Sequence, residues 1–413
     1  MINDSSCRNM SKAGLNWIKR KLSLFARYMA TPFKERSTVR KLHKWCIEQN
    51  ILPTYNPVTG KILIVRLDEI GDYLLWRNSL SVYKFSPKWK DCHITLLGNK
   101  VWKEIFEYAD STSVDEAIWV DKNRYFEPDY RRELWIRLRE EGFETVICPS
   151  RTRTPLLDDA CAMATGAETM FASANIYFKG GYNEISDACY QSLYQSKQAK
   201  HDFFFNQDFA NWCCHTGYSF KRPILDVSLF RQPAASDYII CFIGASRRSN
   251  QIPVKTWIQL LELLQQQYPS RIILAGGPFD KAAAAQITSA VPVNSIVGET
   301  SLLEMINYTA FANAVITGDT MAAHLAVSCQ KPVLIISNGI DFIRFAGYQE
   351  AGIPNVETLY ATPFMEERKK KKTQQMAGYV AVTNDISTID APDILKALYN
   401  VYPVAIMKVV NNA

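Results

Sequence analysis

The 413-residue sequence lacks several patterns that would assign it directly to a class of protein. No apolar run approaches the roughly 20 residues that a membrane-spanning helix needs. The first residues lack the basic and apolar regions of a signal peptide, and the ten cysteines contain no Cys-x-x-Cys pair. We therefore expect free thiols in a reducing cytoplasm. A Gly-x-Gly-x-x-Gly sequence is also absent, which argues against a dinucleotide-dependent oxidoreductase.

The composition describes a folded protein whose charge is unevenly distributed. Hydrophobic residues make up 47% of the chain and charged residues 21%, which excludes a disordered protein. Residues 1–50 carry a net charge of +8, so the remaining chain carries about −2. A nearly neutral body argues against nucleic-acid binding. Cys213-Cys214-His215 is too compact for a zinc site, and we expect neither a metal nor another cofactor.

The basic N-terminal segment predicts an amphipathic helix. Its apolar residues recur at steps of three and four, as on one helical face: Leu15, Ile18, Leu22, Phe25 and Met29. Two interpretations remain open. Residues 12–29 lie on an anionic membrane surface, or the apolar stripe packs on the protein's own body. A second helix is expected from about Thr38 to Gln49.

Strand and helix patterns alternate from Lys61 onward, which predicts a parallel sheet with right-handed crossovers. Strands are expected at residues 62–66, 93–97, 117–120 and 145–148, and helices around 100–109, 129–142 and 156–165. Gly71 and Asp72 lie where the first strand turns into a helix, a position where Asp is also a preferred helix cap. The later loop 150–154 contains Arg151 and Arg153, which either contact an acidic acceptor or are solvated. Residues 171–237 show no clean period and are interpreted as the end of this domain followed by a connection.

A second alternating region begins at Tyr238, with a phosphate-like loop after its first strand. The small residues Gly244 and Ser246 allow close backbone approach, and Arg247 and Arg248 can offset phosphate charge; a solvated surface turn is the alternative. Asp280 precedes an alanine-rich helix, where it either accepts a hydrogen bond from a ribose or caps the helix.

The stretch 315–337 predicts a strand, a turn, a helix and another strand. Asp319 and Thr320 fall at the start of that helix, at the carboxyl end of a strand, and His324 follows within its first turns. Unpaired helix N–H groups at such an edge attract anions. We therefore expect part of a nucleotide to bind here, with capping by Asp319 as the alternative.

Three motifs together resemble glycosyltransferase family 9, the family of the ADP-heptose:lipopolysaccharide heptosyltransferases. They are Ile62-Leu-Ile-Val-Arg-Leu-Asp-Glu-Ile-Gly-Asp72, Gly298-Glu-Thr-Ser-Leu-Leu-Glu304 and Gly318-Asp-Thr-Met-Ala-Ala-His324, and the resemblance covers residues 61–340. It implies an α/β protein of GT-B architecture, with two Rossmann-like domains facing across a cleft. The implied divisions are a basic helical extension (1–60), an acceptor-side domain (61–230), a nucleotide-sugar domain (238–385) and a C-terminal helical segment (386–413).

The resemblance also implies a function. The implied reaction is inverting, metal-independent sugar transfer from a nucleotide-sugar, with an ADP-sugar favoured, to a lipopolysaccharide or another surface-glycan or glycolipid acceptor. Asp72 corresponds to the family's general base, and Asp319, Thr320 and His324 to its donor-contacting residues. Such an enzyme would be cytoplasmic and peripheral on the inner face of the inner membrane.

The sequence departs from the family at two positions. Asn250 stands where many relatives have a phosphate-binding lysine, and Met321 where they have a glycine. A nucleotide-sugar-binding protein with lost or altered catalysis is therefore the alternative function. Beyond residue 340, the charge run 366–372 is expected to be a solvated loop, with contact to an acidic lipid or a diphosphate as the alternative. A final helix at 386–398 is expected to pack back on the first domain.

Overall fold

The computed structural model describes most of the chain between residues 40 and 403. The described residues are 40–41, 44–45, 48–49, 52–176, 182–196, 198–235, 237–267, 271–340, 342–370 and 386–403. The expected amphipathic segment at residues 12–29 lies outside them. Within the expected helix 38–49, residues 40, 41, 44, 45 and 48 are helical.

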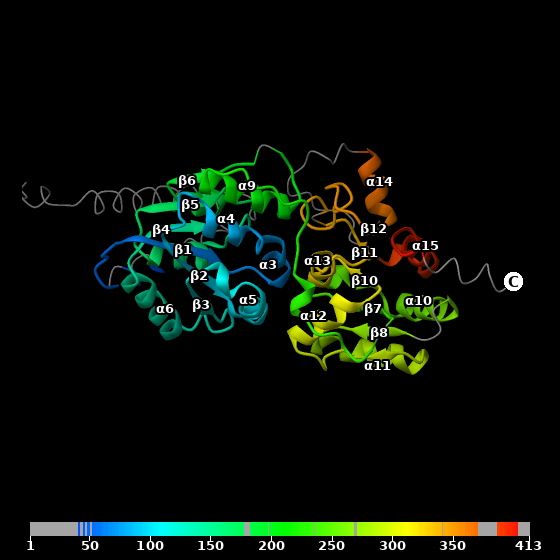
Figure 1. The fold of residues 1–413 in the computed structure, drawn as a ribbon. Helices are drawn as coiled ribbons and strands as arrows, with labels where there is room; N and C mark the ends of the chain where they lie inside the picture. The colour runs from blue at the N-terminus through cyan, green and yellow to red at the C-terminus, as the bar shows by residue number, and fades with distance from the viewer. Residues whose placement is uncertain are drawn as a thin grey trace, which may run out of the picture.

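The first half of the protein is built on a parallel six-stranded sheet (Figure 1). Its strands are β1 (Val58–Arg66), β2 (His93–Asn99), β3 (Glu116–Val120), β4 (Phe143–Cys148), β5 (Thr169–Ser173) and β6 (Ser192–Tyr194). Its helices are α3 (Ile70–Trp76), α4 (Ser79–Phe85), α5 (Lys103–Ala109), α6 (Pro128–Glu140), α7 (Ala160–Ala164), α8 (Tyr182–Asp187) and α9 (Asp202–Cys214). The strand order is β3-β2-β1-β4-β5-β6.

The second half repeats this plan. Its strands are β7 (Ile239–Phe242), β8 (Ile272–Ala275), β9 (Asn294–Ser295), β10 (Ala314–Gly318), β11 (Val333–Ser337) and β12 (Val356–Tyr360). Its helices are α10 (Val254–Gln267), α11 (Lys281–Ala290), α12 (Leu302–Phe311), α13 (Met321–Ser328), α14 (Thr362–Lys370) and α15 (Ala391–Val401). The order β12-β11-β10-β7-β8-β9 is that of the first sheet read from the opposite edge.

Both sheets reverse their direction of growth at a central strand pair. In the first sheet this pair is β1 and β4, and in the second it is β7 and β10. Loops at the carboxyl ends of such a pair diverge and leave a crevice, which is where open α/β sheets bind ligands. The loops that follow β1, β4, β7 and β10 contain most of the candidate site residues.

The two halves pack directly on each other through helices. Helix α3 contacts α13, and α5 contacts α12, so that these four helices face one another in the middle of Figure 1. One buried apolar cluster crosses the boundary, because Trp76 of the first half packs in the same cluster as Ile306 and Leu325 of the second. This burial removes water from the region around the loop between β1 and α3.

The fold extends the sequence prediction in the region 171–237. Strands β5 and β6 pair with the first sheet, and α9 packs against α3 and α4. The aromatic residues there contribute to this packing; for example, the ring centroids of Tyr194 and Phe209 are 6.0 Å apart. They obscured the periodic pattern because nearly every face of α9 is buried.

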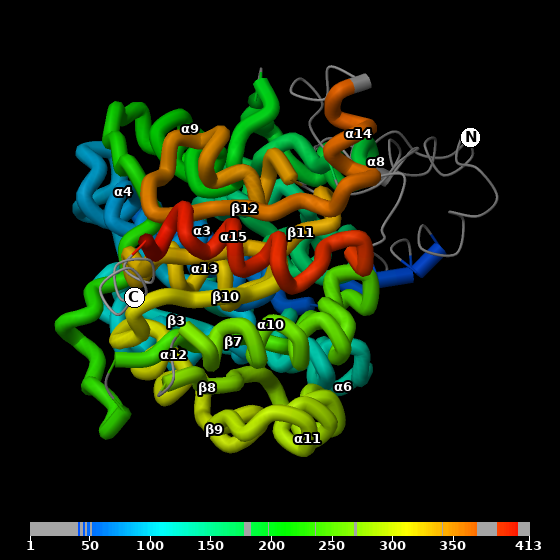
Figure 2. The backbone as a smooth tube through the Cα atoms, turned by 90° about the vertical axis from the view of Figure 1, so that its right-hand side faces the viewer, coloured from blue at the N-terminus to red at the C-terminus, as the bar shows by residue number. Residues whose placement is uncertain are grey.

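Two expectations for the C-terminal region are wrong. The charge run at 366–372 was expected to be a loop, but its described part belongs to helix α14, where Arg368 pairs with Glu350 at 2.8 Å. The final helix α15 packs against α10 and β12 of the second half rather than on the first (Figure 2). Its buried residues Ile394 and Leu398 share an apolar cluster with Trp257 of α10, which explains the choice of partner.

Candidate active site

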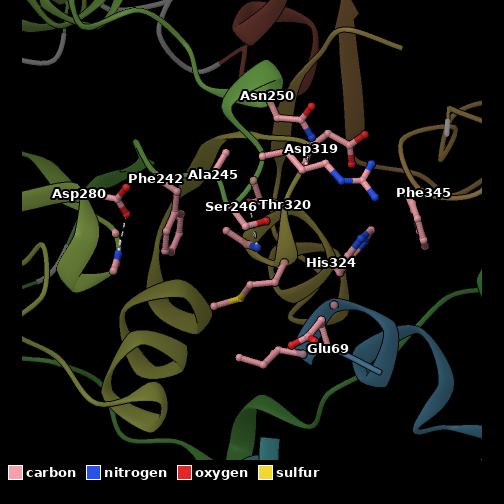
Figure 3. Close-up of a pocket in the computed structure, with 18 of the residues that line it drawn as sticks. Glu69, Phe242, Ala245, Ser246, Asn250, Asp280, Asp319, Thr320, His324 and Phe345 are labelled. Atoms are coloured by element: carbon pink, nitrogen blue, oxygen red, sulfur yellow. Dashed lines mark hydrogen bonds between the residues drawn. The ribbon is translucent and has the colours of Figure 1, made fainter. Parts of the chain in front are cut away.

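A cavity of about 550 Å³ lies between the two halves and is lined by residues from both. Nine of the residues predicted from the sequence line it: Gly71, Asp72, Gly244, Ser246, Arg247, Asp280, Asp319, Thr320 and His324. In the view of Figure 3, Glu69 of the first half lies on one side, Asp319 lies on the other, and His324 lies between them. The fold thus brings together residues that are up to 253 positions apart in sequence.

Asp72 occupies the first turn of α3, next to the cavity. The N-cap of α3 is Glu69, so Asp72 is not the capping residue considered as its alternative role. Burial, and after it the nearby Asp68, raise the pKa of Asp72 to about 7 against the opposing effect of Arg66 and Arg344. A carboxylate with this pKa can accept a proton near neutral pH.

Asp72 is next to a network of hydrogen bonds and an ion pair formed by Arg66, Asp68 and Ser150. Arg66 donates to the Asp72 carbonyl oxygen at 3.2 Å and pairs with Asp68 at 3.0 Å. Asp68 also accepts a hydrogen bond from the Ser150 hydroxyl at 3.0 Å, which ties the loop after β1 to the loop after β4. Arg66 is buried, and its Nε and Nη1 atoms have no hydrogen-bond partner within the described part of the chain. Its charge therefore acts at short range in a region of low dielectric.

His324 of α13 contacts the start of α3, the helix that contains Asp72. Its Nδ1 atom is 2.6 Å from the Tyr348 hydroxyl, and burial lowers the pKa of His324 to about 3, with the nearby His201 adding to the effect. The imidazole is therefore neutral at physiological pH. A Cβ atom on Gly71 would lie only 2.8 Å from His324 Cδ2, so the close contact requires glycine.

The start of α13 is held by a network that the sequence did not reveal. Thr320, not Asp319, is the N-cap, and its hydroxyl accepts from the Ala322 N–H at 3.3 Å. The Asn250 amide donates to the Asp319 carbonyl oxygen at 3.2 Å and accepts from Asn338 Nδ2 at 3.0 Å. Asn250 thus lines the cavity and joins three loops through uncharged hydrogen bonds.

The Asp280 carboxylate packs closely against Gly244. Asp280 accepts a hydrogen bond from the Gly277 N–H at 2.8 Å, and it makes no side-chain cap to α11. A Cβ atom on Gly244 would lie 2.0 Å from Asp280 Oδ2. Gly244 therefore accommodates a carboxylate of the protein itself, whereas the sequence had suggested an approaching ligand.

Of the four arginines predicted for the site, Arg247 lines the cavity and the other three do not. Arg248 is exposed next to it but does not line the cavity. Arg151 is buried and pairs with Asp202 at 2.7 Å. Arg153 is fully buried and pairs with Asp159 at 3.0 Å. The burial of both arginines contradicts the solvated interpretation of the loop 150–154, and the full burial of Arg153 also leaves no atom of it accessible to an acceptor.

The part of the chain that the structure describes shows neither a metal-ligand cluster nor a membrane-spanning helix. It contains no cluster of three or more histidine, cysteine, aspartate or glutamate residues placed to hold a metal ion. None of its helices has the length and apolar character needed to cross a bilayer.

Two parallel sheets that face each other across a ligand-sized cavity define the class: an α/β protein of the GT-B type. Within that class, residues 193–375 match the model of glycosyltransferase family 9 (heptosyltransferase). This match confirms the resemblance that the second and third motifs indicated, and the first motif lies outside the matched residues. The match covers α9 and most of the second half.

Solved structures with the same fold extend the likeness to the first half. The glycosyl transferase of family 9 from Veillonella parvula superposes with a TM-score of 0.63 at 16% identity, covering 84% of this chain and 97% of that one. Heptosyltransferase WaaC of E. coli, solved with ADP, gives a TM-score of 0.63 at 16% identity, covering 82% and 99%. The ADP-heptose lps heptosyltransferase II of E. coli superposes with a TM-score of 0.61 at 15% identity, covering 84% of this chain and 99% of that one. No curated protein matches the chain by sequence. At these identities the structural likeness shows the fold and leaves the substrate to be argued from the site.

The Gly71–His324 contact generates a first prediction. Gly71→Ala places a methyl group against a buried imidazole that Tyr348 holds, and overpacking of this kind costs about 1–3 kcal/mol. The free energy of unfolding should fall by that amount in urea denaturation followed by tryptophan fluorescence. Gly217→Ala is the control, because a Cβ atom there meets no heavy atom within 4 Å. Equal stability of the two variants would contradict the close contact.

The burial of Arg153 generates a second prediction. Arg153→Gln leaves Asp159 buried without its ionic partner, which costs roughly 3–5 kcal/mol of folding free energy. The same denaturation measurement on Arg248→Gln should change stability by less than about 0.5 kcal/mol, since that side chain is exposed. A wild-type unfolding curve for Arg153→Gln would show that this arginine is not the structural residue described above.

Proposed function

We propose that the protein is an inverting, metal-independent glycosyltransferase that moves a sugar from a nucleotide-sugar to a glycan or glycolipid acceptor. The observation that supports this most directly is the position of Asp72. It lies at the switch point of the first sheet and borders the same cavity as Asp319 and His324 at the switch point of the second. The arrangement offers a base from one half to a donor held by the other.

The proposed chemistry needs one proton acceptor and one stabilised leaving group. The acceptor hydroxyl oxygen forms a bond to the anomeric carbon of the donor while the bond from that carbon to the diphosphate oxygen breaks. Asp72 takes the hydroxyl proton, for which its raised pKa of about 7 suits it. The departing nucleoside diphosphate carries the electron pair and needs N–H groups or cations around it.

The donor-side residues fit parts of a nucleotide-sugar. The first N–H groups of α13, together with the Arg247 guanidinium, offer positive charge to the diphosphate. Phe279 lines the cavity and is fully exposed, which suits stacking on a nucleobase. Asp280 is 2.8 Å from the Gly277 amide nitrogen through Oδ2, so its second carboxylate oxygen is available to a ribose hydroxyl. Neutral His324 can donate from Nε2 when Nδ1 accepts from Tyr348.

We infer that the donor is an ADP-sugar, for which heptose is the first candidate. The support is that WaaC of E. coli, which has the same fold, was solved with ADP and with ADP-2-deoxy-2-fluoro heptose. The acceptor is proposed to be a lipopolysaccharide precursor or another surface glycan at the cytoplasmic face of the membrane. The N-terminal residues 12–29 are the proposed membrane contact, which a vesicle sedimentation assay with and without residues 1–50 tests.

A second function is favoured by two residues that line the cavity. Asn250 supplies no charge where relatives have lysine, and Met321 narrows the approach to the start of α13. A nucleotide-sugar-binding protein with lost or altered catalysis would show donor affinity by calorimetry and no turnover with any acceptor in a broad panel.

The proposed base generates a third prediction. Asp72→Asn keeps the shape of the side chain but cannot accept a proton, so transfer should fall at least about 100-fold while donor binding stays near that of the wild type. In the wild type, kcat should rise with pH and reach half its maximum near pH 7, because only the deprotonated form of Asp72 acts as a base. Release of nucleoside diphosphate measures both. Full turnover by Asp72→Asn would exclude this assignment.

The two adjacent arginines generate a fourth prediction. Arg247→Gln removes charge from the cavity wall and should raise KM for the donor by about 10-fold or more, as expected for a charge-assisted phosphate contact. Arg248→Gln is the matched control, since this neighbour does not line the cavity, and its KM should remain within about 2-fold of the wild type. Equal effects from the two variants would remove Arg247 from the donor site.

A further inference from the structure

A buried ionic cluster joins the two halves beside the candidate site. Arg344 follows β11 in the second half, and its guanidinium binds Asp202 at the start of α9 through two bonds of 3.2 and 2.7 Å. Arg151, from the loop after β4, binds the same carboxylate at 2.7 Å. All three side chains are buried. Burial alone would raise the pKa of Asp202, but the two guanidinium groups lower it to about 2, so the cluster stays charged.

Backbone contacts reinforce this cluster at the same junction. The Asp202 N–H donates to the Arg344 carbonyl oxygen at 2.9 Å. The ring of His201 contacts the Phe345 carbonyl oxygen through Nε2 at 2.9 Å, and Phe345 lines the cavity. The start of α9 is therefore fastened to the segment 344–345 by side chains and main chain together.

The junction continues to the helix that faces Asp72. Tyr348 packs its ring on His201, with centroids 4.4 Å apart, and its hydroxyl lies 2.6 Å from His324 Nδ1. His324 in turn contacts Gly71, next to Asp72. An unbroken set of contacts thus runs from the cluster to the base, through side chains that have little freedom because they are buried.

The charges that face Asp72 come from both halves. Arg66 ends β1 and Asp68 lies in the loop before α3, whereas Arg344 comes from the segment after β11 and Asp202 from α9. On α13, the only titratable side chain is His324, which is neutral. Arg344 is therefore a cation of the second half that favours the carboxylate form of Asp72, and Asp202 is the anion paired with this cation.

We propose that Arg344 and Asp202 are positioning residues: their buried pair locks the second half against the first and fixes the charge that faces the Asp72 carboxyl. The inference rests on the proposed role of Asp72 as the base. It adds that the strength of this base is set across the domain boundary. Neither residue lines the cavity, so both act through Asp72 rather than on the substrate.

Two variants that break the same ion pair separate this role from a structural one. Arg344→Gln removes a cation that favours the carboxylate, so the titration midpoint of Asp72 should rise. Asp202→Asn removes an anion and should lower the midpoint, each change being roughly half a pH unit or more. A pair that only supports the fold would move the midpoint in neither variant or in the same direction in both, and that result would overturn the proposal.

The midpoint can be read without a substrate. In protein labelled with carbon-13 at the aspartate carboxyl carbons, the Asp72 signal is assigned by its loss in Asp72→Asn and titrated by NMR. Arg344→Lys keeps the charge and should keep the wild-type midpoint. Arg368→Gln is the control, because it removes an ion pair in the same half that lies at the surface. If Arg344→Gln does not fold, an Asp202→Asn midpoint at or above the wild-type value still refutes the proposal.

A second measurement separates failure of this inference from failure of the proposed function. Release of nucleoside diphosphate from ADP-sugars is followed against pH in the same proteins, and the acid limb should move with the NMR midpoint. Opposite NMR shifts without turnover in the wild type would support the lock and reject the transferase. Turnover in the wild type with unshifted midpoints in both variants would support the transferase and reject the lock.

Discussion

The direct packing of α3 on α13 is the contact on which the candidate site depends. It removes water from the start of α3, and this burial is the largest cause of the raised pKa of Asp72. The packing is close because Gly71 has no side chain to hold His324 away. If the two halves separated, Asp72 would be solvated, its pKa would fall towards that of an ordinary aspartate, and it would be a weaker base. The proposed chemistry therefore depends on an interface between halves as much as on any single residue.

The repeated strand order explains how such an interface can be built from two similar halves. Each sheet places its switch point at the carboxyl ends of its central strands, and the halves face each other through these ends. One switch point supplies the carboxylate and the other supplies the helix terminus with Arg247. Neither half contains both parts, so the proposed reaction requires the whole arrangement. This division also lets residues of the second half such as Asn250 and Met321 change without disturbing the proposed base.

The sequence predicted the fold class and the elements that bear the three motifs, because these elements are short, strongly apolar and bounded by clear turns. It did not predict the ion pair between Asp202 and Arg344, which are 142 positions apart and lie in segments without a periodic pattern. It also misjudged Arg153, because a sequence shows that a loop is polar but does not show that Arg153 pairs with the buried Asp159. Local patterns indicate where a strand ends, whereas partners from distant segments decide whether a charge is exposed or buried.

The buried charges around the base are balanced in a way that bears on the proposed transfer. The cations are Arg66, Arg151 and Arg344, and the anions are Asp68, Asp202 and ionised Asp72. This set is neutral while Asp72 is ready to accept a proton, and it gains one positive charge when the proton arrives. In the proposed reaction the leaving diphosphate gains negative charge at the same moment. A fixed positive charge near it in a region of low dielectric favours that step without reorganisation. The cluster would then assist both proton transfer and departure of the leaving group, and this gives a physical reason to keep three costly buried arginines in one place.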